Sequence, residues 1–126
     1  MNKVKIETAQ APAAIGPYSQ AIRAGNCIFV SGQLPVDAET GELIAEVAAA
    51  TQKSLSNIAA ILAAAGCTMN QVVKTTVFLS DLNDFQAMNQ AYSGFFTANA
   101  PARSTIEVAG LPKGAVVEIE AIAVVD

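Results

Sequence analysis

The segment KTTVFLSDLNDF, residues 74–85, decides the fold because the spacing of its apolar side chains changes along it. Up to Leu79 the residues alternate and many are β-branched, which is typical of a β-strand. Residues 80–84 then offer several helix N-caps. Beyond them the large apolar residues recur at helical spacing: Phe85, Met88, Tyr92 and Phe95. The segment therefore predicts a strand that leads directly into an amphipathic helix.

A second amphipathic helix is predicted upstream, over residues 47–65. This stretch is rich in alanine, and its apolar residues recur at offsets of three, four and three: Leu55, Ile58, Leu62 and Ala65. Gly66 follows directly and is expected to end the helix, because glycine readily adopts the left-handed conformation found at helix ends.

Five further strands are predicted on either side of these helices. They are residues 3–7, 20–24, 27–30, 103–108 and 116–125. Gly25 and Asn26 form a plausible two-residue hairpin turn, and we expect a second hairpin at the C-terminal end, around residues 110–114. The element order βββαβαββ predicts an α+β fold, with a single sheet covered on one face by two helices.

The other face of the predicted sheet carries apolar residues, among them Ile122 and Val124. The composition points the same way, because 52% of the residues are hydrophobic and only 14% are charged. An alanine-rich chain without partners is the alternative. We expect association of several copies to cover this face, in a closed ring.

The length of 126 residues and the lack of a polar linker predict a single domain, residues 1–126. The net charge is −4 and the few basic residues are scattered, so no nucleic-acid partner is expected. No stretch is long and apolar enough for a membrane span, and the first residues lack a signal-peptide core. We expect a cytoplasmic protein with no membrane partner.

The sequence offers few residues for a metal site or a catalytic triad. The chain has no histidine, and its two cysteines are far apart and outside any C-x-x-C pattern, so no metal site is expected. Cys27 and Cys67 both have apolar neighbours, and free cysteine commonly serves as a small hydrophobic residue. A disulfide between them is the alternative reading.

The remaining candidates for a functional site are polar residues near strand ends and loops. They are Tyr18, Ser31, Asn89, Arg103, Glu118 and Glu120, together with Gly32, which lets a ligand approach the backbone. Each has an ordinary structural explanation. Arg103 fits a solvated strand end, the two glutamates fit a solvated strand face, and Tyr18 fits a loop anchored to the core.

Five segments of the chain, in order, resemble the RidA (YjgF) family of reactive intermediate deaminases. They are APAAIGPYSQ (11–20), FVSGQLP (29–35), KTTVFLSDLNDF (74–85), PARS (101–104) and EIEA (118–121). The resemblance covers essentially the whole chain. It implies a chorismate-mutase-like fold, a homotrimer with a cleft at each subunit interface, and no cofactor. It also implies hydrolysis of 2-iminopropanoate and 2-iminobutanoate to 2-keto acids and ammonia.

The resemblance also assigns roles to residues. It implies that Arg103 holds the substrate carboxylate and that Glu118 assists the attacking water. The positions that match other pocket residues of the family are Tyr18, Ser31, Gly32, Asn89 and Thr105. Thr105 stands where the family often has cysteine. Imine hydrolysis needs no nucleophilic side chain, and if this position contributes through its backbone carbonyl, the identity of the side chain matters little.

Two other functions stay open from the sequence. A trimeric binding or regulatory module would use the same arginine-lined cleft to sense a keto acid without turnover. RNA cleavage has been attached to the family, but the acidic balance and the lack of histidine disfavour it.

Overall fold

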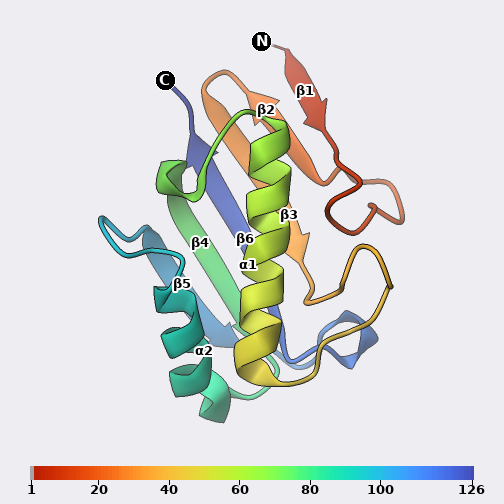
Figure 1. Ribbon diagram of the computed structural model, residues 1–126, viewed down its shortest axis with the longest axis vertical. Coiled ribbons are helices and arrows are strands. Elements are labelled where there is room, and N and C mark those ends of the chain that lie inside the picture. The colour runs from red at the N-terminus through yellow and green to blue at the C-terminus, as the bar shows by residue number, and fades with distance from the viewer. Residues whose placement is uncertain (1) are drawn as a thin grey trace.

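Within residues 2–126, six strands form one mixed sheet, and strands and two helices succeed one another along the chain in the predicted order (Figure 1). The computed structural model describes residues 2–126. The strands are β1 (Lys3–Ile6), β2 (Ala21–Ala24), β3 (Cys27–Gln33), β4 (Val72–Leu79), β5 (Ala102–Glu107) and β6 (Val117–Val124). The helices are α1 (Val47–Ala64) and α2 (Phe85–Ser93), with short 3-10 turns at Met69–Gln71, Leu82–Asp84 and Pro112–Gly114.

The order of strands in the sheet is β1-β2-β3-β6-β4-β5. β2 and β3 form the predicted hairpin, with Ala24 opposite Cys27. The hairpin predicted at the C-terminal end is wrong. β5 pairs parallel to β4, and β6 lies between β3 and β4, antiparallel to both. In a strand–helix–strand unit such as β4-α2-β5, the second strand pairs parallel to the first. The last strand, β6, therefore occupies the central position between β3 and β4.

The composition of the last two strands explains this arrangement. On β6, Val117, Ile119 and Ala123 are fully buried, so the strand suits the centre of the sheet. β5 is largely exposed and carries Arg103 and Glu107, and charged side chains are a common protection for an edge strand.

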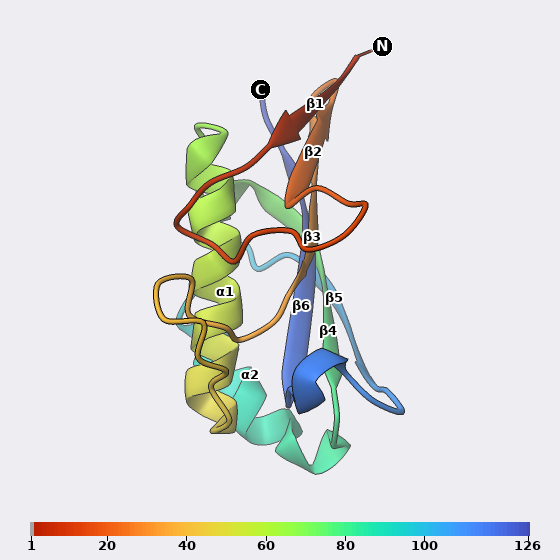
Figure 2. The ribbon, with the colours of Figure 1, turned by 90° about the vertical axis from the view of Figure 1, so that its right-hand side faces the viewer.

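Both helices cover the same face of the sheet, and the opposite face has no helix over it (Figure 2). Four fully buried α1 residues fill the space between the layers: Leu55, Ile58, Ile61 and Leu62. α1 ends close to the predicted position, and Gly66 has a φ of +78°. These features confirm the α+β class with one sheet and two helices on one face.

The uncovered face, called the open face below, is apolar in part. Strand alternation places Phe29 and Ile106 on it, and their side chains are 47% and 46% exposed. Ile122 and Val124 lie on this face as predicted, both partly exposed. Cys27 and Cys67 are both free thiols. Within residues 2–126, neither helix is long and apolar enough to cross a membrane.

Candidate functional site

A β-bulge at the end of β3 positions the first group of candidate residues. Val30 pairs with Ala121 and Gln33 with Ile119, so β3 uses one residue more than β6 over this stretch. Bulges of this kind redirect the residues they contain. Here the bulge brings Gly32 against Glu118. A Cβ atom on Gly32 would lie 2.9 Å from Cδ of Glu118 and 3.0 Å from its Oε2.

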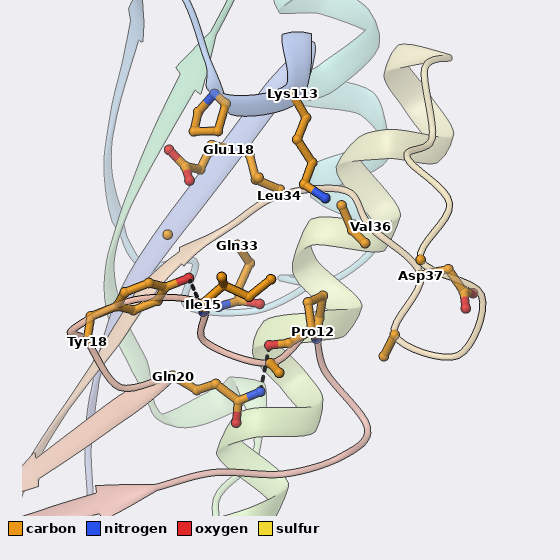
Figure 3. Close-up of a pocket in the computed structure, with 15 residues that line it drawn as sticks. Pro12, Ile15, Tyr18, Gln20, Gln33, Leu34, Val36, Asp37, Lys113 and Glu118 are labelled. Carbon is orange, nitrogen blue, oxygen red and sulfur yellow. Dashed lines mark hydrogen bonds between the residues drawn. The ribbon is translucent and has the colours of Figure 1, made fainter.

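Gly32 and Glu118 line a cavity of about 570 Å³. Its other walls come from the loop before β2 (residues 12–20), the last residue of β3 with the segment that follows it (residues 33–41) and the 3-10 turn before β6 (residues 112–113). Figure 3 shows these segments around the cavity, with Tyr18 and Ile15 on one side and Glu118 and Lys113 on another. The walls are formed mainly by apolar groups, and Glu118 is one of few ionisable residues there.

The environment of Glu118 raises its pKa above the ordinary glutamate value. Burial is the main cause, because a partly desolvated carboxylate loses hydration, and the nearby carboxylate of Glu120 adds repulsion. A raised pKa brings a carboxyl group closer to the range in which a general acid or base works near neutral pH. Glu118 is therefore suited to exchange protons with a water in the cavity.

Tyr18 makes a hydrogen bond within the loop before β2, and Ser31 ties this loop to β3. The hydroxyl of Tyr18 accepts a hydrogen bond from the backbone N–H of Ile15, at 3.4 Å. Oγ of Ser31 donates to the carbonyl of Ser19 at 2.6 Å, so this hydroxyl is already engaged. Tyr18 lines the cavity, whereas Ser31 fastens the loop to the bulge beside Gly32.

Arg103 lies on the other face of the sheet, toward the helices. It is the second residue of β5 and pairs with Thr75, and its guanidinium carbon lies 4.7 Å from the ring centre of Tyr92 and 5.6 Å from that of Phe85. Both rings belong to α2 and attract the cation through their π-faces. None of the hydrogen bonds or salt bridges found in residues 2–126 involves the guanidinium. Its donors are thus available to an anion.

Thr105 and Asn89 are the other candidates on this side. Thr105 follows Arg103 by two residues on β5, and so shares its face. Its Oγ1 is buried and, within the described chain, has no hydrogen-bond partner. Asn89 is exposed on α2 at a spacing of four from Phe85 and three from Tyr92, which places it on the same side of the helix.

The predicted residues therefore form two groups rather than one. Tyr18, Gly32 and Glu118 share a cavity. On β6, Glu118 alternates with the buried Val117 and Ile119, which face the helices, so it points to the open face. Arg103 points to the helix face. Within one chain, the structure does not bring the proposed carboxylate-binding and water-activating residues together.

Comparison with known proteins identifies the chain's relatives. The family model described as Endoribonuclease L-PSP matches residues 8–125. The chain belongs to this family. A 2-iminobutanoate/2-iminopropanoate deaminase of Escherichia coli is 56% identical over 122 residues, 94% of this chain and 95% of that protein. A RutC family protein of Pyrococcus abyssi is 52% identical over 124 residues, 98% of each chain.

Solved structures of the Endoribonuclease L-PSP family share the fold. The crystal structure of the YjgF gene product from Escherichia coli matches with a TM-score of 0.95 and 54% identity, over 98% of this chain and 99% of that one. RidA from Psychrobacter matches with a TM-score of 0.94 and 46% identity, over 97% and 99%. The RidA (YjgF) resemblance read from the sequence is thereby confirmed.

Sequence reasoning missed three residues that shape the two groups. Phe85 and Tyr92 repeat at the spacing of an amphipathic helix, but they also support the guanidinium of Arg103. The only signal in the sequence was that these two aromatic residues lie seven positions apart on a predicted helix, and that the next predicted strand contains an arginine. Gln20 is buried and organises the loop before β2, and nothing in its sequence context distinguishes it from a surface glutamine.

Proposed function

We propose that this chain hydrolyses 2-imino acids, such as 2-iminopropanoate and 2-iminobutanoate, to 2-keto acids and ammonia. Relatives that carry this activity in their names are 52% to 56% identical over 94% of the chain. The observation that carries the proposal is the pair of complementary groups. A guanidinium that makes no hydrogen bond or salt bridge within residues 2–126 suits the substrate carboxylate, and a carboxyl group of raised pKa suits the water.

The chemistry needs only these groups and water. Arg103 binds the carboxylate through two parallel N–H donors, a geometry that lysine lacks. Glu118 takes a proton from water as the water oxygen bonds to the imine carbon, and it passes this proton to the imine nitrogen, which gives a carbinolamine. Glu118 then takes the proton of the carbinolamine hydroxyl as the carbon–oxygen double bond of the keto acid forms and the carbon–nitrogen bond breaks. It delivers this second proton to the departing nitrogen, which leaves as ammonia.

The active unit is a homotrimer whose sites lie between neighbouring subunits. Arg103 and Glu118 lie on opposite faces of the sheet, so one chain alone does not complete the site. A neighbour that packs its β5 edge on the open face brings its own Arg103 toward Glu118. The same contact covers Phe29 and Ile106, whose side chains are about half exposed in the single chain.

A small molecule fits this chain better than RNA does. The family description names an endoribonuclease. This sequence has no histidine and a net charge of −4, and neither favours phosphate binding or nuclease acid–base chemistry. We infer that it acts on small imino acids in the cytoplasm, without a nucleic-acid or membrane partner.

A semicarbazide-trapping assay tests the proposal directly. The imino acid is generated in place and either reacts with semicarbazide or is hydrolysed first. We expect purified protein to reduce the amount trapped, in proportion to its concentration, and to elute as a trimer by light scattering. A stable monomer, or trimeric protein that binds 2-ketobutanoate without consuming the imine, would contradict the deaminase and favour the binding-module reading.

Gly32→Ala tests the close approach of the bulge to Glu118. The new methyl group would lie 2.9 to 3.1 Å from the end of the Glu118 side chain, which is flexible and must turn away. We expect turnover to fall by roughly 10- to 100-fold, because a misplaced catalytic group costs rate steeply, while the melting temperature changes little.

Gly110→Ala is the matched control for this substitution. Nothing lies within 4 Å of a Cβ atom at Gly110, and its φ is not in the left-handed region. We expect normal turnover from it. Equal activity of the Gly32 and Gly110 variants would show that the position of the Glu118 carboxylate does not limit the reaction.

A further inference from the structure

Gln20 is one of several buried polar residues that the proposed reaction leaves unexplained. Its side chain is 4% exposed, and it lies directly before β2 at the edge of the cavity. Buried amides are costly unless their hydrogen-bonding groups are satisfied. The partners of Gln20 therefore indicate what it does.

The amide of Gln20 fastens the loop that precedes it. Its Oε1 accepts a hydrogen bond from the backbone N–H of Thr8 at 2.7 Å. Its Nε2 lies within hydrogen-bond distance of three backbone carbonyls, 2.7 Å from Pro12, 3.1 Å from Thr8 and 3.2 Å from Ala11. Figure 3 shows the bond to Pro12 below the cavity. One side chain thus holds a segment eight to twelve residues away.

The backbone of Gln20 connects the same loop to the bulge in β3. Its carbonyl accepts a hydrogen bond from the N–H of Ser31 at 2.9 Å, and Ser31 precedes Gly32 in the bulge. Between the two anchors, residues 12–18 carry Ile15 and Tyr18 along the cavity wall. Those two side chains are 83% and 54% exposed, so they add little anchoring to the core.

We propose that Gln20 is a positioning residue: its buried amide holds residues 8–18 in place, so that Tyr18 and the loop wall off the cavity beside Glu118. This inference rests on the proposed function only for its kinetic part. The loop has no secondary structure of its own, and loop conformations of this kind depend on a few side-chain bonds. Without the amide, we expect the loop to open and to expose the carboxyl group of Glu118 more fully to solvent.

The expected consequence is a change in the pKa of Glu118. Gln20 would cause it through the loop and not by direct contact. Burial is the main reason that the pKa of Glu118 is raised, so an open loop should return this pKa toward the ordinary glutamate value. The other ionisable groups at the cavity are Tyr18, Asp37 and Lys113, and Glu120 lies two residues along β6. The variants below leave all four unchanged, so a shift reports the loop.

Gln20→Met removes the amide but keeps a side chain of similar length. The pKa of Glu118 is followed by NMR of protein labelled with ¹³C at the glutamate carboxyl carbons, and Glu118→Gln identifies its signal. We expect the pKa to fall relative to the unsubstituted protein. In the deaminase assay we expect KM to rise several-fold and the acid limb of the rate profile to move to lower pH. Gln20→Asn keeps an amide one methylene short and should give smaller changes in the same direction.

Ile61→Val is the matched control, because Ile61 is fully buried in the core and does not line the cavity. It should lower the melting temperature without changing the pKa of Glu118. An unchanged pKa in Gln20→Met, or in Gln20→Asn if Gln20→Met does not fold, would overturn the proposal. So would an equal shift in Ile61→Val. Because the titration needs no substrate, it decides the role of Gln20 even if the unsubstituted protein shows no deaminase activity.

Discussion

Arg103→Ala is expected to lose nearly all imine hydrolysis and to bind 2-keto acids poorly. A bidentate, charge-assisted contact contributes about 1.5 to 3 kcal/mol, which corresponds to roughly 10- to 100-fold in affinity. Turnover should fall further, because the carboxylate contact also sets the angle at which water meets the imine carbon. Titration calorimetry with 2-ketobutanoate and the trapping assay measure the two losses separately.

Arg103→Lys and Arg23→Ala complete this experiment. Lysine keeps the charge at position 103 but lacks the planar donors, and it stacks less well on Tyr92 and Phe85, so we expect little rescue. Arg23, the other arginine of the chain, lies on β2, where its Nε donates to the carbonyl of Gly25. Its replacement should leave binding unchanged. Full deaminase activity in Arg103→Ala would show that the carboxylate is bound elsewhere.

The elements of the fold were predictable because their signals are local. Alternation along β4 and the helical spacing of Leu55, Ile58 and Leu62 follow from one buried face for each element. The position of β6 was not predictable in this way. Two strands joined by a Gly- and Pro-rich segment have the same local signal whether they pair or separate. Here the parallel pairing of β5 with β4 determines the position of β6, and this pairing is a property of the assembled sheet.

The sequence predicts a set of candidate site residues, but it does not predict their geometry. The motifs containing Tyr18, Gly32, Arg103 and Glu118 are visible in the sequence, yet the bulge that aims Gly32 at Glu118 depends on pairing with a strand more than eighty residues later. Arg103 and Glu118 point to opposite faces of the sheet. This too depends on which side chains of β5 and β6 face the helices. A residue list therefore does not indicate that Arg103 and Glu118 lie apart within one chain.

Glu118→Gln is expected to separate binding from rate. Glutamine keeps the shape of the side chain but takes no proton from water, so turnover should fall by roughly 10²- to 10⁴-fold. Binding of 2-ketobutanoate, which depends on Arg103, should change little. In the unsubstituted protein the rate should fall as the pH drops through the raised pKa of Glu118, because only the deprotonated carboxylate acts as base. The residual rate of the variant should lack this acid limb.

Glu120→Gln is the control for the pH dependence. Glu120 is exposed on the same strand, and its carboxylate raises the pKa of Glu118 through repulsion. Its removal should therefore lower that pKa, move the acid limb to lower pH and preserve turnover at neutral pH. Normal turnover in Glu118→Gln would place water activation on another group, such as a backbone carbonyl near Thr105.

Mixed oligomers decide whether Arg103 and Glu118 act from different subunits. If each site takes Arg103 from one chain and Glu118 from its neighbour, trimers formed from equal amounts of Arg103→Ala and Glu118→Gln chains contain some sites with both native residues. Random mixing in a closed ring gives about a quarter of the sites in this state, so co-expression of two nearly inactive variants should restore about a quarter of the activity. If both residues served from the same chain, every site would lack one of them. Mixed trimers as inactive as their parents would then exclude the composite site, even if each single substitution behaved as expected.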